Sequence, residues 1–250
     1  MKIITVLNQK GGVGKTTVSL GLFSALQHEN KRVLLVDLDE QSNATHGVIN
    51  DYTTPTIYEL YKGVAEVQDA IIHTSQGDII PGNLNMNTID AEIKRIDKQF
   101  VLKEILEPLK KKYDFIIIDT QADIGTTTIN ALVSADYVII PTHAQAFSID
   151  GIITIKSAID QVKKYFNKKL KCLGIVLNQY NARTKLSKEL LPIIEEQAQT
   201  LNTTVFETKI RQCGAIGEAQ LLMESIIDYA PRSNGAKDFK SLAKEVIERI

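Results

Sequence analysis

The segment Lys10-Gly-Gly-Val-Gly-Lys-Thr-Thr17 predicts both the fold and the chemistry of this chain. It follows an apolar run from Ile3 to Leu7, typical of a strand, and precedes a helical pattern from Thr16 to about Glu29. A strand, a glycine-rich loop and a helix in this order are the context that a phosphate-binding loop requires. The glycines let successive backbone N–H groups turn toward one anion, and the helix adds the positive end of its dipole. The segment therefore predicts a site for a nucleoside triphosphate.

Within this loop, Lys15 is expected to reach the β and γ phosphates, and the Thr16 hydroxyl is expected to ligate Mg²⁺. ATP and Mg²⁺ are therefore the predicted cofactors. The predicted ATP contacts in the loop are Lys10, Gly11, Gly12, Val13, Gly14, Lys15, Thr16 and Thr17.

The loop departs from the common pattern G-x-x-x-x-G-K-[ST] at its first glycine. That glycine would fall at Gln9, and Lys10 follows it. The arrangement resembles the deviant Walker A motif of the ParA, Soj and MinD family of partition and positioning ATPases. The resemblance extends from Lys2 to Glu248. It implies that Lys10 crosses a dimer interface to the partner's nucleotide, so that two ATP molecules lie between two subunits.

Short, nearly continuous apolar runs recur along the chain with helical segments between them. Such runs are typical of strands that are covered on both faces of a parallel sheet. We expect a doubly wound α/β fold in one domain, residues 1–250, with a mostly parallel sheet and helices on both faces. Ligands should then bind at the C-terminal ends of the strands. The runs are Ile3 to Leu7, Val33 to Val36, Phe115 to Ile118, Tyr137 to Ile140 and Leu173 to Leu177, and Asp78 to Pro81 is a further short candidate.

The second apolar run ends in the sequence Val-Asp-Leu-Asp-Glu-Gln-Ser-Asn-Ala-Thr, residues 36–45. A carboxylate at a strand end beside a triphosphate can hold the water shell of the metal or orient the attacking water. The segment is similar to the family motif D-x-D-P-Q-x-N-A-T, with Glu40 and Ser42 as departures. The resemblance implies that Asp39 orients the hydrolytic water and that Asp37 lies near the Mg²⁺ shell. The predicted catalytic residues are thus Lys10, Lys15 and Asp39.

The third run, Phe115-Ile-Ile-Ile-Asp119, resembles a Walker B segment, in which the terminal carboxylate faces Mg²⁺ directly or through water. Thr16, Asp37 and Asp119 form the predicted metal site. In the loop that follows, Gln121 and Ala122 stand where the family usually has two prolines, so a rigid turn is lost.

The fifth run ends at Asn178, within a segment that resembles the ParA/Soj segment whose asparagine helps bind adenine. An amide side chain suits a base edge because it can both donate and accept hydrogen bonds.

Composition is that of an ordinary soluble globular protein, with 44% hydrophobic and 24% charged residues among 250. No run reaches the ~18 apolar residues of a membrane span, and the N-terminus shows no signal peptide, so we expect a cytoplasmic protein. The last helical pattern carries an apolar stripe, and its polar face mixes both charges, which favours core packing over membrane binding. The stripe comprises Phe239, Leu242, Ala243, Val246, Ile247 and Ile250.

Charge is distributed unevenly along the chain. Residues 1–150 carry 13 Lys and Arg against 19 Asp and Glu, whereas residues 151–250 carry 16 against 11. The C-terminal part could therefore present a basic face to a polyanion. This excess and the resemblance together suggest six phosphate-contact candidates for DNA: Lys185, Lys188, Lys209, Arg211, Arg232 and Lys237.

The resemblance implies a ParA/Soj-type ATPase for DNA partition. In that cycle, an ATP-bound homodimer binds DNA without sequence preference and associates with the nucleoid. A ParB-like or other cargo-bound adaptor then stimulates hydrolysis, and no membrane is involved. Two alternatives stay open at this point, a MinD-like positioning ATPase on a membrane and an ATP-dependent metabolic ligase of related fold.

Overall fold

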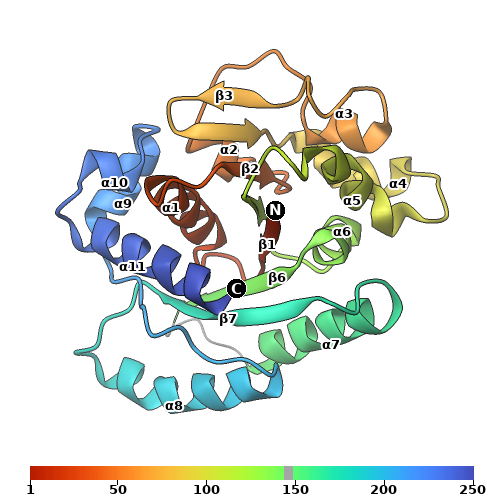
Figure 1. The fold of residues 1–250 in the computed structure, drawn as a ribbon. Coiled ribbons are helices and arrows are strands. Elements are labelled where there is room, and N and C mark those ends of the chain that lie inside the picture. Colours follow the sequence, from red (N-terminus) through yellow and green to blue (C-terminus); the bar gives the residue numbers. More distant parts are fainter. Residues whose placement is uncertain (144–148) are drawn as a thin grey trace.

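The computed structural model describes residues 1–143 and 149–250, and shows a central sheet with helices on both faces (Figure 1). Within these residues the sheet has seven strands in the order β3-β4-β2-β5-β1-β6-β7. All neighbouring strands run parallel except β3 and β4. The predicted doubly wound α/β fold is confirmed. The strands are β1 (Lys2–Val6), β2 (Val33–Asp37), β3 (Ile72–Thr74), β4 (Gly77–Ile80), β5 (Phe115–Asp119), β6 (Tyr137–His143) and β7 (Lys171–Asn178).

Helices connect these strands and cover the sheet. The α-helices are α1 (Lys15–His28), α2 (Asn43–His46), α3 (Ile57–Lys62), α4 (Ile89–Glu92), α5 (Val101–Leu106), α6 (Thr126–Ser134), α7 (Ile149–Tyr165), α8 (Lys185–Thr200), α9 (Gly214–Leu221), α10 (Ile226–Tyr229) and α11 (Asn234–Arg249). Three short 3₁₀ helices are η1 (Leu84–Thr88), η2 (Lys98–Phe100) and η3 (Glu107–Leu109).

The apolar runs form strands because each is covered from both sides. Every residue of β2 and of β5 is buried, so these strands need no polar face. The five predicted strands and the candidate at Asp78 to Pro81 are confirmed. The edge strand β3 escaped prediction because it has only three residues and none of them is fully buried.

Two hydrophobic layers enclose the sheet. Side chains from α3, α5, α6, α7 and α8 pack on one face, and side chains from α1, α9, α10 and α11 pack on the other. Helices α1 and α11 approach closely at Gly21, where an added Cβ would lie 2.2 Å from the Phe239 ring. The predicted core packing of the last helix is confirmed, because Phe239, Leu242, Ala243 and Val246 are fully buried. No helix in the described part of the chain is long and apolar enough to cross a membrane.

Candidate nucleotide-binding and hydrolysis site

Strand register brings the predicted site residues together. Val6, the last residue of β1, pairs with Asp119 of β5, and Asp119 in turn pairs with Asp37 of β2. The loop that follows β1 therefore begins beside both carboxylates. At the other side of β1, His143 of β6 pairs with Asn178 at the end of β7. The sequence-distant candidates thus converge on the C-terminal edge of the sheet, as a doubly wound fold requires.

The glycine loop has a backbone that only glycine adopts readily. Gly12 and Gly14 have φ angles of +74° and +90°, in the left-handed region. A Cβ at Gly14 would lie 1.9 Å from Asn178 Nδ2, whereas a Cβ at Gly11 or Gly12 would meet nothing within 4 Å. The loop is therefore packed tightly on its Asn178 side and open at its glycine tip, as a phosphate cradle must be.

Asn178 is buried, and its Nδ2 donates to the Val13 carbonyl at 3.1 Å. This hydrogen bond ties the end of β7 to the phosphate loop. Asn178 therefore supports the shape of the loop, and its amide oxygen remains the group that adenine recognition would use.

Lys15 is a buried cation of the phosphate loop. The residue is only 7% exposed, and its Nζ donates to the Lys10 carbonyl at 3.4 Å. Burial lowers the pKa of Lys15, and the nearby carboxylates, Asp119 foremost, oppose this shift. An ammonium group so placed at the mouth of an open loop fits the oxygens of a bound phosphate.

Asp119 accepts hydroxyl hydrogen bonds on both carboxylate oxygens. Thr16 Oγ1 donates to Oδ2 at 2.8 Å, and Ser19 Oγ donates to Oδ1 at 2.7 Å. Burial raises the pKa of Asp119, and the charge of neighbouring Asp37 raises it further. Sequence analysis missed Ser19, although its position one helical turn beyond Thr16 places both hydroxyls on one face of α1.

Two fully buried carboxylates side by side are costly unless a cation offsets them. Burial also raises the pKa of Asp37, although hydrogen bonds from Thr45 oppose the shift. Together with the Thr16 hydroxyl, these acidic oxygens are the donors that Mg²⁺ prefers. The predicted metal-site residues therefore lie together and fit a magnesium ion.

Asp39 lies at the surface of a cleft of about 720 Å³, which the glycine loop also lines. The backbone N–H of Asp39 donates to Asp37 Oδ1 at 3.0 Å, and its Oδ1 accepts from the Gln41 N–H at 2.9 Å. The carboxylate is thus held in the cleft rather than in the core. Further lining residues that the sequence did not single out are Asn43, His46, Gln179, Gln220 and Leu221.

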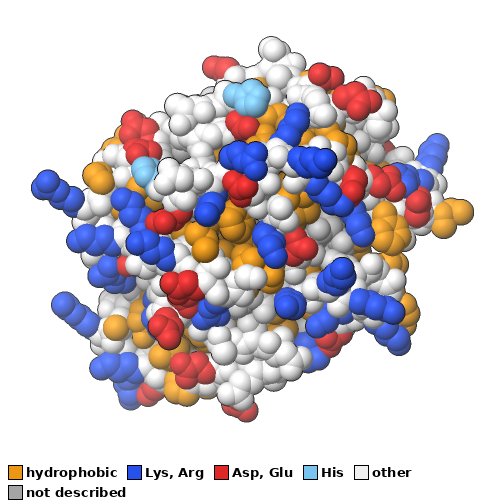
Figure 2. Space-filling view, viewed as in Figure 1, with side chains coloured by type: hydrophobic (Ala, Val, Ile, Leu, Met, Phe, Trp, Pro, Cys, Tyr) orange, Lys and Arg blue, Asp and Glu red, His pale blue; other side chains and the backbone are white. Residues whose placement is uncertain are grey.

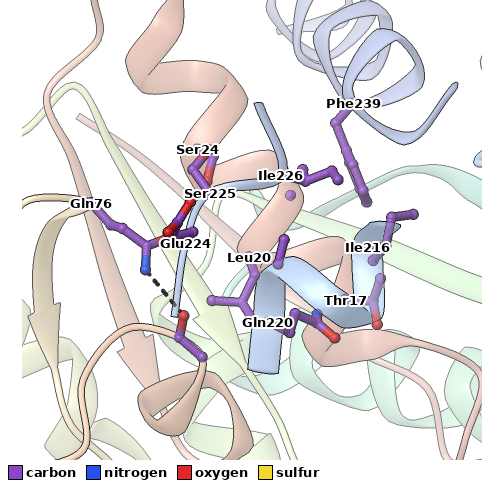
Figure 3. A pocket seen from close by; sticks show the side chains of 13 residues that line it. Thr17, Leu20, Ser24, Gln76, Ile216, Gln220, Glu224, Ser225, Ile226 and Phe239 are labelled. Carbon is purple, nitrogen blue, oxygen red and sulfur yellow. Dashed lines mark hydrogen bonds between the residues drawn. The ribbon is translucent and has the colours of Figure 1, made fainter. Parts of the chain in front are cut away.

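Helix α9 forms one wall of this cleft and packs on α1. A smaller cavity of about 20 Å³ lies between the two helices, and Thr17 and Gln220 line both spaces (Figure 3). Gln76, from the turn between β3 and β4, donates through Nε2 to the Gly47 carbonyl at 3.2 Å and to the Met223 carbonyl at 2.6 Å. This side chain links the residue after α2 to the segment after α9.

The loop after β5 lacks the usual prolines but is tied by side chains. Gln121 Nε2 donates to Thr127 Oγ1 at 3.0 Å, and Thr128 Oγ1 donates to the Asp123 carbonyl at 2.9 Å. These bonds fasten the loop to the first turn of α6. A set of local hydrogen bonds therefore holds the loop where the family usually has a proline turn.

Asp119→Asn is expected to gain stability relative to the wild type as pH rises in the nucleotide-free protein. The folded state raises the Asp119 pKa above its unfolded value near ~4, so ionised Asp119 destabilises the fold at higher pH. The difference in unfolding free energy between the two proteins should therefore shift in favour of asparagine as pH rises from 5 to 7. Urea unfolding of both proteins across this range measures it, and a difference that does not change with pH would contradict the assignment.

Two of the six predicted DNA contacts lie together at another place. Lys209 and Arg211 line a cleft of about 620 Å³ together with Arg183, which sequence analysis missed. Asn234, the first residue of α11, also lines this cleft, whereas Arg232 and Lys237 are not among its lining residues. Lys185 and Lys188 lie on the first turn of α8 and are exposed. On the face drawn in Figure 2, Lys and Arg side chains lie along the left edge, with Asp and Glu side chains among them, and also over the right side of the molecule.

Two of these cations already have partners within the chain. Arg211 forms a two-point ion pair with Asp238, with Nε to Oδ2 at 2.9 Å and Nη2 to Oδ1 at 2.6 Å. Lys185 Nζ lies 3.6 Å from Glu189, and its side chain is 88% exposed. The Arg211 ion pair therefore also fastens the segment that precedes α9 onto helix α11. An exposed ion pair such as that of Lys185 contributes little to stability.

This geometry is that of a P-loop ATPase. The AAA domain family matches residues 1–172. The sporulation initiation inhibitor protein Soj of Bacillus subtilis is 37% identical over 250 residues, covering 98% of each chain. The chromosome partitioning protein ParA of Myxococcus xanthus is 32% identical, covering 99% of this chain and 88% of that protein. The chain belongs to the ParA/Soj family of partition ATPases, and the resemblance read from its motifs is confirmed.

The fold is shared more widely than the sequence. The crystal structure of cobyrinic acid a,c-diamide synthase from Mycobacterium smegmatis with bound ADP and magnesium matches with a TM-score of 0.87. It is 27% identical and covers 99% of this chain and 94% of that chain. Because one fold serves different activities, the assignment rests on the full-length Soj and ParA relatives rather than on the fold.

Proposed function

We propose that an ATP-bound dimer of this chain binds DNA without sequence preference and that ATP hydrolysis releases it. A partner bound to cargo stimulates hydrolysis, and the protein associates with the nucleoid while ATP is bound. The observation that carries the proposal is that one small chain holds both a nucleotide-binding cleft and a separate basic cleft. The Soj and ParA relatives support partition as the process served.

The chain's own groups account for ATP binding. Backbone N–H groups of the glycine loop and the buried Lys15 ammonium bind the phosphates, and the α1 dipole assists. Thr16, with Asp119 and Asp37 behind it, would hold Mg²⁺, which offsets phosphate charge during cleavage. Asp39 is the carboxylate placed in the cleft, where it orients the attacking water.

Lys10 supports a dimeric arrangement. It is exposed, and it contributes to its own loop through the backbone carbonyl that accepts from Lys15. Its side chain is therefore available to the phosphates of a partner subunit's nucleotide. Such a contact would complete the site only when two ATP-loaded subunits meet, which would couple nucleotide state to dimer formation.

The basic cleft supports DNA binding through the phosphate backbone. Arg183, Lys209 and Arg211 line it, and no acidic side chain does so in the described part of the chain. The N-terminus of α11 adds the positive end of a 16-residue helix at Asn234. Phosphate contacts of this kind carry no sequence information, which matches binding without sequence preference.

DNA affinity is expected to require ATP and to fall steeply with salt. We would measure the Kd for random-sequence duplex DNA with no nucleotide, with ADP and with ATP·Mg²⁺ between 50 and 200 mM salt. Each phosphate neutralised contributes a slope of about −0.9 to log K against log salt. The double variant Arg183→Glu/Lys209→Glu should weaken binding at least about tenfold and flatten the slope by about 2.

Lys111→Glu/Lys112→Glu is the control with the same change in charge, because both lysines are exposed and lie just before β5, away from the cleft. It should leave affinity unchanged. Equal loss in the control and the double variant, or a salt-independent affinity, would contradict the cleft as the DNA site. Absence of DNA binding in every nucleotide state would overturn the proposed function while leaving the ATPase assignment intact.

A further inference from the structure

The structure assigns Thr45 as a positioning residue for hydrolysis, through Asp37 and the loop that carries Asp39. The backbone N–H and the Oγ1 of Thr45 both donate to Asp37 Oδ2, each at 2.8 Å. The other oxygen of Asp37 accepts from the Asp39 N–H at 3.0 Å. One buried carboxylate therefore ties the first and last residues of the 39–45 segment together.

These hydrogen bonds give Asp37 a structural role in addition to its predicted place near the metal: it holds the 39–45 segment. Both of its oxygens are engaged by donors from the chain, and the residue is fully buried. Its carboxylate therefore acts as the anchor of the segment, and Thr45 supplies two of the three hydrogen bonds. Because hydrogen bonds to a charged group are stronger than neutral ones, this anchor holds the segment firmly.

The Thr45 hydroxyl also accepts a hydrogen bond, and this bond links the loop after β4 to the 39–45 segment. The Gly82 N–H, just beyond β4, donates to Thr45 Oγ1 at 2.8 Å. A Cβ at Gly82 would lie 2.8 Å from Ser42 Oγ and 3.1 Å from the Asp39 carbonyl. The loop after β4 therefore presses directly against the Asp39 segment, and Thr45 fixes the spacing between them.

Thr45 is fully buried and does not line the nucleotide cleft, whereas Asn43 and His46 on either side do. Removing its hydroxyl should therefore disturb the placement of Asp39 without removing an ATP contact. A shift of about 1 Å in a catalytic group can cost on the order of 100-fold in rate. The inference rests on the proposed role of Asp39 in orienting water.

The decisive variant is Thr45→Val, which keeps the shape and the backbone N–H but neither donates nor accepts through its side chain. We expect kcat for ATP hydrolysis to fall about 10- to 100-fold, while KM for ATP stays within about twofold. Thr45→Ser should restore kcat to within about threefold. In the nucleotide-free protein, amide hydrogen exchange in residues 39–45 should become faster in the valine variant and remain slow in the serine variant.

Thr5→Val is the matched control, because Thr5 is a fully buried β1 threonine whose Oγ1 donates to the Ala131 carbonyl at 3.1 Å. It should leave kcat and the exchange of residues 39–45 unchanged. If Thr45→Val does not fold, Thr45→Ala also removes the hydroxyl and keeps the backbone N–H, and it should lower kcat in the same way.

A Thr45→Val protein with normal kcat and normal exchange would overturn the assignment. A serine variant as slow as the valine variant would also overturn it, since the hydroxyl would then not be the active element. A hydrolytically normal Asp39→Ala protein would instead remove the proposed function of Asp39, so the two failures are distinguishable.

Discussion

Lys15→Ala is expected to raise the Kd for ATP at least about 100-fold. Lys15 is the buried cation of the phosphate loop, and its ammonium group lies at the loop mouth with one carbonyl partner at 3.4 Å. Charge-assisted hydrogen bonds to phosphate would be lost, and so would the attraction between the Lys15 ammonium and the buried Asp119 carboxylate. Isothermal titration with ATP·Mg²⁺ measures the change.

Lys10→Ala is the control for this experiment, because it retains the backbone carbonyl that Lys15 uses. It should bind ATP within a few-fold of the wild type but fail to dimerise when ATP is added. Wild-type affinity in Lys15→Ala would contradict the assignment of the phosphate loop. Normal ATP-dependent dimerisation in Lys10→Ala would instead contradict the role proposed for Lys10 across the interface.

Asp39→Ala is expected to lower the rate of ATP hydrolysis at least about 100-fold while ATP binding and ATP-dependent dimerisation persist. The truncation removes the carboxylate from the cleft but keeps the backbone bonds of residue 39 to Asp37 and Ser42. The segment should therefore keep its path. Phosphate release measures the rate of hydrolysis, and light scattering measures ATP-dependent dimerisation.

Glu40→Ala provides the comparison, since Glu40 is the adjacent acid and only its neighbour Gln41 contacts its carboxylate among the bonds described. Its hydrolysis rate should stay within about threefold of the wild type. Equal losses in both variants would mean that general acidity of the segment matters, and the specific role of Asp39 would then be wrong.

The sequence predicts the centre of this site because strand ends and glycines carry strong local signals. A continuous apolar strand that ends in aspartate has few structural uses, and the parallel register then places Asp37 beside Asp119. The glycine pattern similarly predicts a loop whose backbone only glycine readily adopts at positions 12 and 14. These residues were identified without knowing any tertiary contact.

The supporting residues could not be predicted because their roles depend on contacts distant in sequence. The Thr45 hydroxyl accepts from the N–H of Gly82, 37 residues away, and Arg183 joins the basic cleft only because the segment at Lys209 folds back beside it. A sequence charge count likewise could not show that Arg211 is paired with Asp238. Tertiary packing decides such cases.

Antiparallel strand β3 illustrates the same limit for the fold. Its three residues, Ile72–Thr74, are partly exposed and show no run of apolar side chains. The strand exists because the tight turn at Gly77, with φ +120°, returns the chain along β4. Pairing with a neighbour, rather than local preference, therefore determines this edge of the sheet.

The central claim is that hydrolysis at Asp39 ends a DNA-bound state that ATP begins. The most direct test is the lifetime of single protein molecules on random-sequence DNA with ATP·Mg²⁺, for the wild type and for Asp39→Ala. We predict that wild-type molecules leave at the rate of ATP hydrolysis, whereas Asp39→Ala molecules stay at least about tenfold longer. Equal lifetimes for the two proteins, in the presence of a confirmed hydrolysis defect, would contradict the claim.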